Sequence, residues 1–255
     1  MTYCVGMLVE DGLAMIADTR TNAGVDNISS YRKLHVVDRP GERVLAVATA
    51  GNLSVTQTAL AMAREGVHLN VGEELETLET ATSMFRCAQL LGHALRSVRQ
   101  SIAPGLEADS LNTSASMLLG GQIAGGPMQL FLIYSQGNFI ECGTDTPFLQ
   151  IGEAKYGKPI LVSGLRSTTP LAEAVKLGLI SFSTTMRSNV GVGAPFDLIT
   201  LRRDMISGDE RRIEADDPYF TDLHDRWTRA QAQARTAMPE PPWMLPGMPM
   251  AANGG

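Results

Sequence analysis

The sequence predicts an α+β fold in which two β-sheets lie face to face between two layers of helices. Apolar strands come in two batches, within residues 3–50 and 113–153, and helical segments separate and follow them. The run 44–50 is almost continuously apolar, so both of its faces are expected to be covered. Two stacked sheets with helices on their outer faces give such a strand a buried contact on each side. We therefore expect a four-layer αββα sandwich.

The composition is that of a globular protein with an acidic balance of charge. The 255 residues are 44% hydrophobic and 19% charged, which suits one large domain or two small ones. The net charge of -6 argues against nucleic acid as a partner. No apolar run approaches the roughly 18 residues of a membrane span, and no signal peptide opens the chain. We expect a cytoplasmic protein without a membrane partner.

The residues that most often bind metals show no ligand pattern. The three cysteines are odd in number and widely spaced, which is typical of reduced cytosolic thiols and excludes a disulfide framework. The four histidines are scattered along the chain without a ligand spacing. We therefore expect no metal and no cofactor.

The first half of the chain is expected to begin with a β-hairpin. The turn signal Asp11-Gly12 separates two short apolar runs. Lys33 falls within the third expected strand. The strands of this half are expected over residues 3–9, 13–17, 31–37 and 44–50.

Two helices are expected to follow the fourth strand. The first runs from about Leu53 to Glu65, and Asn52 or Ser54 caps it. From Thr80 to Ala103 apolar residues recur at spacings of three and four, which predicts a long amphipathic helix. Because proline and glycine interrupt helices, we expect this second helix to end at Pro104-Gly105.

The second half returns to strands and then mixes helices with strands. A helix is expected with Pro170 at its first position, and Gly178 within it predicts close packing on a neighbour. A strand over 197–202, its hairpin partner over 211–214 and a last helix capped by Asp217 follow. The strands that precede these elements are expected over residues 113–123, 128–135, 138–142 and 148–153.

From Ala237 the composition changes to a tail rich in proline and methionine. Repeated prolines exclude a helix or a central strand there. The tail is either disordered or docked in extended form on another subunit. The predicted organisation is one domain over residues 2–236 and a C-terminal tail over 237–255.

The residue next to the initiator methionine carries the first chemical signal. Removal of Met1 would leave Thr2 as the first residue, with a hydroxyl nucleophile and a free α-amine. An α-amine has an ordinary pKa of about 7.7–8.0, so it can act as general base for its own hydroxyl. The alternative is that Thr2 is an ordinary neighbour of the start codon, since many proteins begin Met-Thr.

Several motifs, in order and with matching spacing, resemble the proteasome β-type peptidases, which are N-terminal-nucleophile hydrolases. The pattern is most similar to the bacterial Anbu branch, the ancestral β subunit, and covers the chain to about residue 236. The resemblance implies the four-layer proteasome-subunit fold. The motifs are Thr2-Tyr3-Cys4-Val5-Gly6, the run 18–27 beginning Asp-Thr-Arg-Thr-Asn, Thr49-Ala50-Gly51-Asn52-Leu53, the run 151–159 and Asp217-Pro218-Tyr219-Phe220.

The resemblance implies a catalytic role for four residues. Thr2 would be the nucleophile, and its own amine would accept the proton. Lys33 would lower the pKa of the hydroxyl, and Asp18 would hold Lys33 in place. Gly51 would donate its backbone N–H to the oxyanion, a contact worth about 10²–10³ in rate in other hydrolases. Taken without the family, Lys33 reads as a lysine on an edge strand and Asp18 as a turn cap.

The resemblance also implies how substrate and copies of the chain would bind. Asn22 and the strand edge near Thr49 would bind the backbone of a peptide or amide substrate as an added β-strand. Proteasome-like subunits assemble, so we expect a homo-oligomer that forms a ring or an open spiral.

Two family motifs are altered, which leaves three functions open. Glu153 stands where the family has the serine of a Gly-Ser-Gly motif. In a second motif, Ser188 and Gly191 stand where the family has aspartate and serine. The first function is a threonine-type hydrolase of peptide or amide bonds. The second is an assembly protein without chemistry, and the third is an amidase or transferase that uses the same Thr2.

Overall fold

The computed structural model describes residues 1–22, 28–70, 74–108 and 112–244. The chain divides into two units, Met1–Ala215 and Asp216–Gly255. The described part of the second unit consists of helix α5 (Pro218–Thr236) and the short 3-10 helix η1 (Pro242–Met244). Asp217 caps α5 as predicted, because its carboxylate accepts a hydrogen bond from Phe220 N at 2.9 Å.

Both sheets of the first unit have five antiparallel strands. The first sheet has the strand order β10-β1-β2-β11-β12, and the predicted hairpin forms its β1–β2 pair. Its strands are β1 (Tyr3–Val9), β2 (Gly12–Asp18), β10 (Phe148–Gly152), β11 (Phe196–Arg202) and β12 (Gly208–Ile213).

The second sheet has the strand order β5-β6-β7-β8-β9, so each strand pairs with its neighbours in sequence. A separate two-stranded ribbon pairs β3 (Arg20–Asn22) with β4 (Ile28–Ser30). The strands of the second sheet are β5 (Leu34–Arg39), β6 (Arg43–Gly51), β7 (Ala115–Ile123), β8 (Gln129–Ile133) and β9 (Phe139–Glu141).

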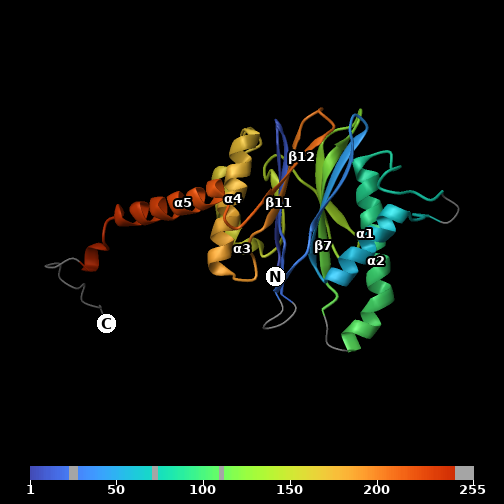
Figure 1. The fold of residues 1–255 in the computed structure, drawn as a ribbon, viewed down its shortest axis with the longest axis horizontal. Helices are drawn as coiled ribbons and strands as arrows, with labels where there is room; N and C mark the ends of the chain where they lie inside the picture. Colours follow the sequence, from blue (N-terminus) through green and yellow to red (C-terminus); the bar gives the residue numbers. More distant parts are fainter. Residues whose placement is uncertain (23–27, 71–73, 109–111, 245–255) are drawn as a thin grey trace, which may run out of the picture. The chain divides into compact units, whose positions relative to one another are not determined.

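The two sheets lie face to face, and a pair of helices covers the outer face of each (Figure 1). Helices α3 (Ala154–Gly164) and α4 (Leu171–Ser188) lie against the first sheet. Helices α1 (Leu53–Glu65) and α2 (Met84–Ala108) lie against the second sheet. The inner strands of each sheet are therefore covered on both faces, which explains why β2, β6 and β7 are apolar and buried on both sides.

Strand β6 shows how alternate residues fill two different cores. Val44, Ala46 and Ala48 point between the sheets, where they join side chains of β1, β2 and β11. Leu45 and Val47 point the other way and pack with α1 and α2. Because successive strand side chains point to opposite faces, a single apolar run can serve both cores.

The predicted close packing of Gly178 is confirmed. A Cβ at this position of α4 would lie only 2.7 Å from side-chain atoms of Ile16 and Met7. The absence of a side chain thus lets α4 approach β1 and β2 directly. Phe182, one turn further along α4, contacts Tyr3 at the start of β1 in a tilted arrangement with 4.5 Å between the ring centroids.

Several details of the sequence prediction differ from the structure. No helix was expected over α3, whose eleven residues contain Pro159. Helix α2 does not end at Pro104-Gly105 but continues to Ala108. Lys33 lies one residue before β5, not inside a strand, and its side chain turns inward to bind Asp18 and the carbonyl of Arg20.

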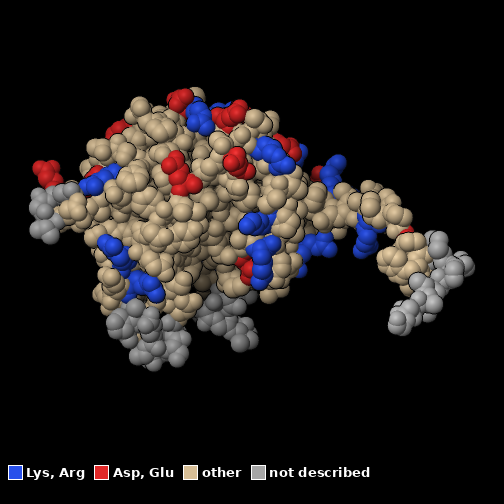
Figure 2. Space-filling view, turned by 180° about the vertical axis from the view of Figure 1, so that it is seen from behind, with Lys and Arg blue, Asp and Glu red and all other residues tan. Residues whose placement is uncertain are grey.

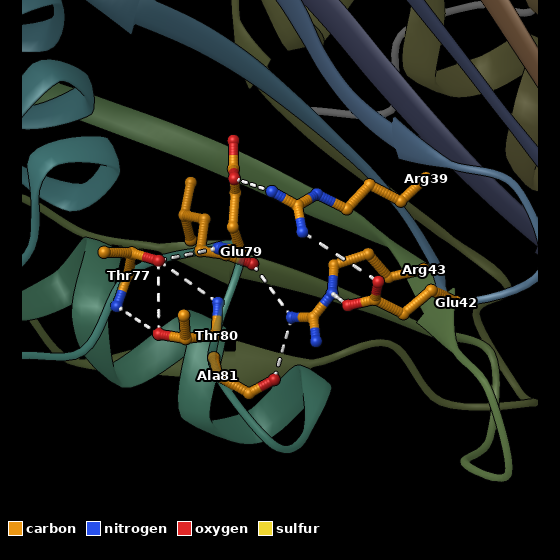
Figure 3. A network of polar contacts seen from close by, with 8 residues as sticks. Arg39, Glu42, Arg43, Thr77, Glu79, Thr80 and Ala81 are labelled. Carbon is orange, nitrogen blue, oxygen red and sulfur yellow. Dashed lines mark hydrogen bonds and ion pairs between the residues drawn. The ribbon is translucent and has the colours of Figure 1, made fainter.

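A buried arginine fixes the connection between α1 and α2 onto the second sheet (Figure 3). Arg43, which is 7% exposed, donates from Nη1 to the carbonyls of Leu78 and Ala81 at 3.1 and 2.9 Å. Arg39 reaches Glu79 of the same connection through an ion pair. Residues 78–81 of this connection are therefore held by cations of the β5–β6 hairpin.

Lysine and arginine side chains lie interspersed with aspartate and glutamate on the described face that Figure 2 shows. Wide areas of other residues separate them, and neither sign forms a continuous field there. Long-range attraction of a polyanion needs such a field of positive charge. None of the described helices is long and apolar enough to cross a membrane.

Two phenylalanines beside Phe139 give a matched test of the core. Phe131 is 1% exposed and Phe85 is 51% exposed, and both rings contact Phe139 edge-on. We expect Phe131→Ala to lower the free energy of unfolding by about 3–5 kcal/mol, because it leaves a cavity in the core. Phe85→Ala should cost much less. Guanidinium unfolding measures both, and equal losses would contradict the assignment of this core.

Candidate active site

Hydrogen bonds on both sides fix the backbone at Thr2. The carbonyl of Thr2 accepts from Glu153 N at 2.7 Å, and Tyr3 pairs with Gly152 of β10. On the other side, Tyr3 N donates to Asp18 Oδ1 at 3.0 Å. Thr2 and Tyr3 are thereby held at the start of an inner strand of the first sheet and not on a free arm.

The side chain of Tyr3 anchors this strand against the helices. Its hydroxyl lies 3.1 Å from Ser181 Oγ, and burial raises its pKa to about 12. A Cβ on Gly157 of α3 would lie 2.5 Å from that hydroxyl, so only glycine leaves room for it. The position of Thr2 therefore depends on packing of α3 and α4 against β1.

Asp18 and Lys33 form a buried ion pair at the end of β2. Lys33 Nζ donates to Asp18 Oδ1 at 2.8 Å and to the carbonyl of Arg20 at 2.6 Å. Asp18 is fully buried and Lys33 is 4% exposed. The structure thus brings together the two charged residues that the family resemblance paired.

Burial raises the pKa of Asp18, and the Lys33 ammonium and the Tyr3 N–H oppose that rise. Among the described residues, Asp18 Oδ2 has no hydrogen-bond partner, so the carboxylate depends on its other oxygen for stabilisation. A buried ion that loses its counter-ion is costly. Lys33 is therefore fixed in place by the need to neutralise Asp18.

Gly51 is the last residue of β6, and only Asn52 separates it from α1. Its φ of +103° lies in the region that favours glycine, and a Cβ there would be 2.3 Å from the Ser114 carbonyl oxygen. Asn52 caps α1 as predicted, with its side chain accepting from Val55 N at 3.2 Å. The positive end of the helix dipole consequently lies directly after Gly51.

A cavity of about 110 Å³ joins these elements. Thr2, Lys33 and Gly51 lie in its wall, and Asp18 supports Lys33 from behind. Met1 also contributes to the wall, and Gly191 packs against it. The complete lining is Met1, Thr2, Thr21, Lys33, Thr49, Ala50, Gly51, Leu53 and Thr56.

The structure describes the side chain of only one of the two predicted substrate-binding residues, Thr49. Thr49 lies in the cavity wall, but its backbone N–H already donates to the Lys33 carbonyl at 2.9 Å. Its N–H is therefore not free to pair with an added strand. Asn22 ends β3, and its side chain lies outside the described part of the structure.

Glu153 and Asn189 form a contact that sequence reasoning missed. Glu153 is 8% exposed, and its Oε2 accepts from Asn189 Nδ2 at 2.8 Å. Asn189 Oδ1 in turn accepts from the backbone of Gly191 at 2.9 Å. The sequence already indicated that Glu153 is unusual, because it replaces a serine of the family motif. No sequence signal indicated Asn189, because its partner is 36 residues away in sequence.

Metal ligands are not grouped in the described ranges of the chain. No three side chains of histidine, cysteine, aspartate or glutamate lie together there as a candidate ion site.

Solved structures similar to this chain share one family. An Anbu complex from Pseudomonas aeruginosa, described as a helical assembly, is 41% identical over 94% of this chain and 98% of its own, with a TM-score of 0.87. An Anbu Gly-1 mutant from Hyphomicrobium sp. strain MC1 is 46% identical over 94% and 99%, with a TM-score of 0.84. Anbu from Yersinia bercovieri is 42% identical over 94% and 98%, with a TM-score of 0.83.

The fold is therefore the proteasome-like N-terminal-nucleophile fold. The chain belongs to the Anbu family, the ancestral β subunit, as its motifs predicted. That family is a proteasome-like, oligomeric one. No protein-family model and no curated protein matches the sequence.

The buried ion pair gives a testable energetic coupling. Lys33→Met should lower the free energy of unfolding by about 3–5 kcal/mol, because it leaves Asp18 buried without a counter-charge. Adding Asp18→Asn removes that charge while keeping an acceptor for Tyr3 N. The double variant should therefore lose less than the sum of the two single losses, by about 0.5–3 kcal/mol. Denaturant unfolding measures this cycle, and strictly additive losses would refute the coupling.

In the single variant Lys33→Met, the free energy of unfolding should also depend on pH. Without Lys33, burial still raises the pKa of Asp18, and only the Tyr3 N–H and the charge of the N-terminus oppose that rise, so the folded pKa lies further above the unfolded value of about 3.9. Between these two values the folded state binds more protons than the unfolded state. Lys33→Met should thus be most stable at low pH and lose stability as the pH rises through the folded pKa. Melting temperatures across pH, with Lys33→Met/Asp18→Asn as the control, test this.

Proposed function

We propose that this protein is a threonine-type N-terminal-nucleophile hydrolase of peptide or amide bonds, built as a four-layer αββα sandwich and active as a homo-oligomer in the cytoplasm. The observation that carries the proposal is the shared wall of one cavity. Thr2, Lys33 and Gly51 lie together there, and Asp18 neutralises the lysine. A nucleophile, a positive charge and an oxyanion donor in one place are the requirements of acyl transfer.

The proposed reaction begins once Met1 has been removed. The Thr2 hydroxyl attacks the substrate carbonyl carbon, and its proton passes to the α-amine of the same residue. The Lys33 ammonium favours the developing alkoxide at Thr2. The carbonyl oxygen becomes an oxyanion, which the Gly51 N–H and the N-terminal end of α1 stabilise.

The intermediate then collapses to an ester on Thr2. The carbon–nitrogen bond of the substrate breaks, and the α-amine returns its proton to the departing nitrogen. Water attacks the ester carbonyl in the second half of the reaction, again with the α-amine as base. This step releases the carboxylic acid and restores Thr2. An amine in place of water would give the transferase outcome from the same intermediate.

A non-catalytic assembly role is the second candidate. Met1 lies in the cavity wall against Gly191. A chain that keeps Met1 has no free α-amine on Thr2, because that nitrogen is part of the peptide bond to Met1. Glu153 and Gly191 also replace the family's serines. The similar protein from Pseudomonas aeruginosa is described as a helical assembly, which supports an oligomer of open geometry for this chain as well.

Intact mass separates the two candidates. We expect protein expressed in a cytoplasm to lack Met1 and to gain one molecule of a threonine-reactive epoxyketone or β-lactone at Thr2. Thr2→Ala should gain none, whereas Thr221→Ala, on exposed α5, should still react. A chain that keeps Met1, or a free Thr2 that does not react, would refute the hydrolase and support the assembly role.

Glu153 is proposed as a positioning residue for the nucleophile. Its backbone holds Thr2 and its carboxylate holds Asn189, so it joins the start of β1 to the loop after α4. Glu153→Ala should slow adduct formation on Thr2 by about tenfold or more, which corresponds to about 1.4 kcal/mol in the barrier.

Glu153→Gln keeps an acceptor for Asn189 and should restore most of the rate of adduct formation. The melting temperature of each variant is the control for general loss of structure. Equal rates in Glu153→Ala and the unchanged protein would exclude a positioning role. A loss in Glu153→Gln as deep as in Glu153→Ala would show that the hydrogen bond to Asn189 is not what matters.

A further inference from the structure

We infer that a second cavity, between α2 and the β8–β9 turn, is a binding site for an oxyanion of the phosphate or carboxylate type. The cavity has a volume of about 230 Å³ and lies outside the candidate active site. Two arginines and three neutral polar residues form its wall. They are Arg96, Arg99, Gln100, Ser135 and Gln136.

The two guanidinium groups carry charge that the described part of the chain does not neutralise. Arg96 and Arg99 take part in none of its ion pairs. The Nε atom of Arg99 is shielded from solvent and has no hydrogen-bond partner there. Buried donors are almost always satisfied, so an unsatisfied one points to a missing acceptor.

Arg96 and Arg99 lie three positions apart on α2, so their positive charges repel each other when no ligand lies between them. Positions three apart lie on the same face of a helix, where like charges repel. The chain has 27 acidic and 21 basic residues, so acidic side chains are plentiful, yet none pairs with these two cations within the described ranges. An anion between the two guanidinium groups would satisfy both, and the planar fork of arginine matches two oxygens of one ligand.

The walls of the cavity are held rigidly. Gly92 of α2 and Gly137 of the turn meet backbone to backbone, and a Cβ on Gly92 would lie 2.3 Å from the Gly137 carbonyl oxygen. Gly137 also has a φ of +87°, which favours glycine. Because this contact needs two glycines, the turn is fixed against the helix. The cavity exists before any ligand arrives, which lowers the entropic cost of binding.

A second contact connects the turn to β7, which pairs with β6 and its residue Gly51. Ser135 Oγ accepts from Ala115 N at 2.8 Å and donates to Ala115 O at 2.5 Å. Ala115 is the β7 partner of Gly51. The anion cavity and Gly51 therefore lie at the same end of the second sheet, on strands joined by this residue. The inference stands on the arginines alone and does not rest on the proposed hydrolysis.

The test uses the full chain and two probes, each titrated calorimetrically at low ionic strength, where surface charges are least screened. Inorganic phosphate stands for a free oxyanion, and a capped aspartyl-glutamate dipeptide stands for carboxylates of a polypeptide. We expect saturable binding of one probe molecule per chain. Tighter binding of phosphate would identify a free anion as the ligand, and tighter binding of the dipeptide would identify an acidic polypeptide segment.

Three substitutions locate the site. Arg99→Gln and Arg96→Gln should each weaken binding at least about tenfold, or about 1.4 kcal/mol. Arg99→Lys keeps the charge but not the fork, and should bind with intermediate strength. Arg211→Gln removes an exposed arginine of β12 and should change binding less than about twofold, which controls for net charge.

Two results would overturn the inference. One is the absence of saturable binding of either probe to the unchanged protein. The other is an equal loss in Arg211→Gln and Arg96→Gln, which would show attraction by overall charge only. Arg96 is exposed, so its substitution tests the site even if Arg99→Gln fails to fold.

Discussion

The buried ion pair of Asp18 and Lys33 is the constraint on which the candidate active site depends. Two charges out of reach of water must neutralise each other, so neither side chain can move without the other. Asp18 also accepts from Tyr3 N, and the Lys33 carbonyl accepts from Thr49 N. One pair therefore connects the start of β1, the end of β2 and the C-terminal part of β6, and so holds Thr2 and Thr49 of the cavity wall relative to each other.

The position of β1 in the sheet explains why a chain terminus can carry precise chemistry. Chain ends are ordinarily poorly ordered unless they are tied down. Here β10 and β2 flank β1, and Tyr3 packs against Phe182 of α4. The residue that would become the new N-terminus is thus held by a sheet and a helix layer together. A proposed nucleophile on the first residue needs this order, because acyl transfer depends on geometry.

Both inferred sites lie at the end of the second sheet where β6 ends and β7 begins. Gly51 and Ala115 are paired there, and each is close to a cavity that contains unusual cations. Lys33 has its counter-charge in Asp18, whereas Arg96 and Arg99 have none among the described residues. Lys33 is therefore already neutralised within the chain, whereas Arg96 and Arg99 are the cations for which we propose a bound anion.

The sequence by itself determined the features that depend on neighbours along the chain. Local turn and cap signals placed the β1–β2 hairpin, the Asn52 cap of α1 and the Asp217 cap of α5. Runs that are apolar on both faces indicated sheets covered on two sides. Motif order along the chain was enough to recognise the Anbu family, and with it the pairing of Asp18 with Lys33.

Only the tertiary structure decided the features that depend on distant residues meeting. The contact of Glu153 with Asn189 requires β10 to lie beside β1 and the end of α4 to reach it. Helix α3 is short and contains a proline, so packing and not local propensity keeps it helical. The cavity of Arg96 and Arg99 forms because Gly92 and Gly137 let a helix touch a turn 45 residues away in sequence. Such contacts are set by sheet register and core packing, which no local pattern in the sequence specifies.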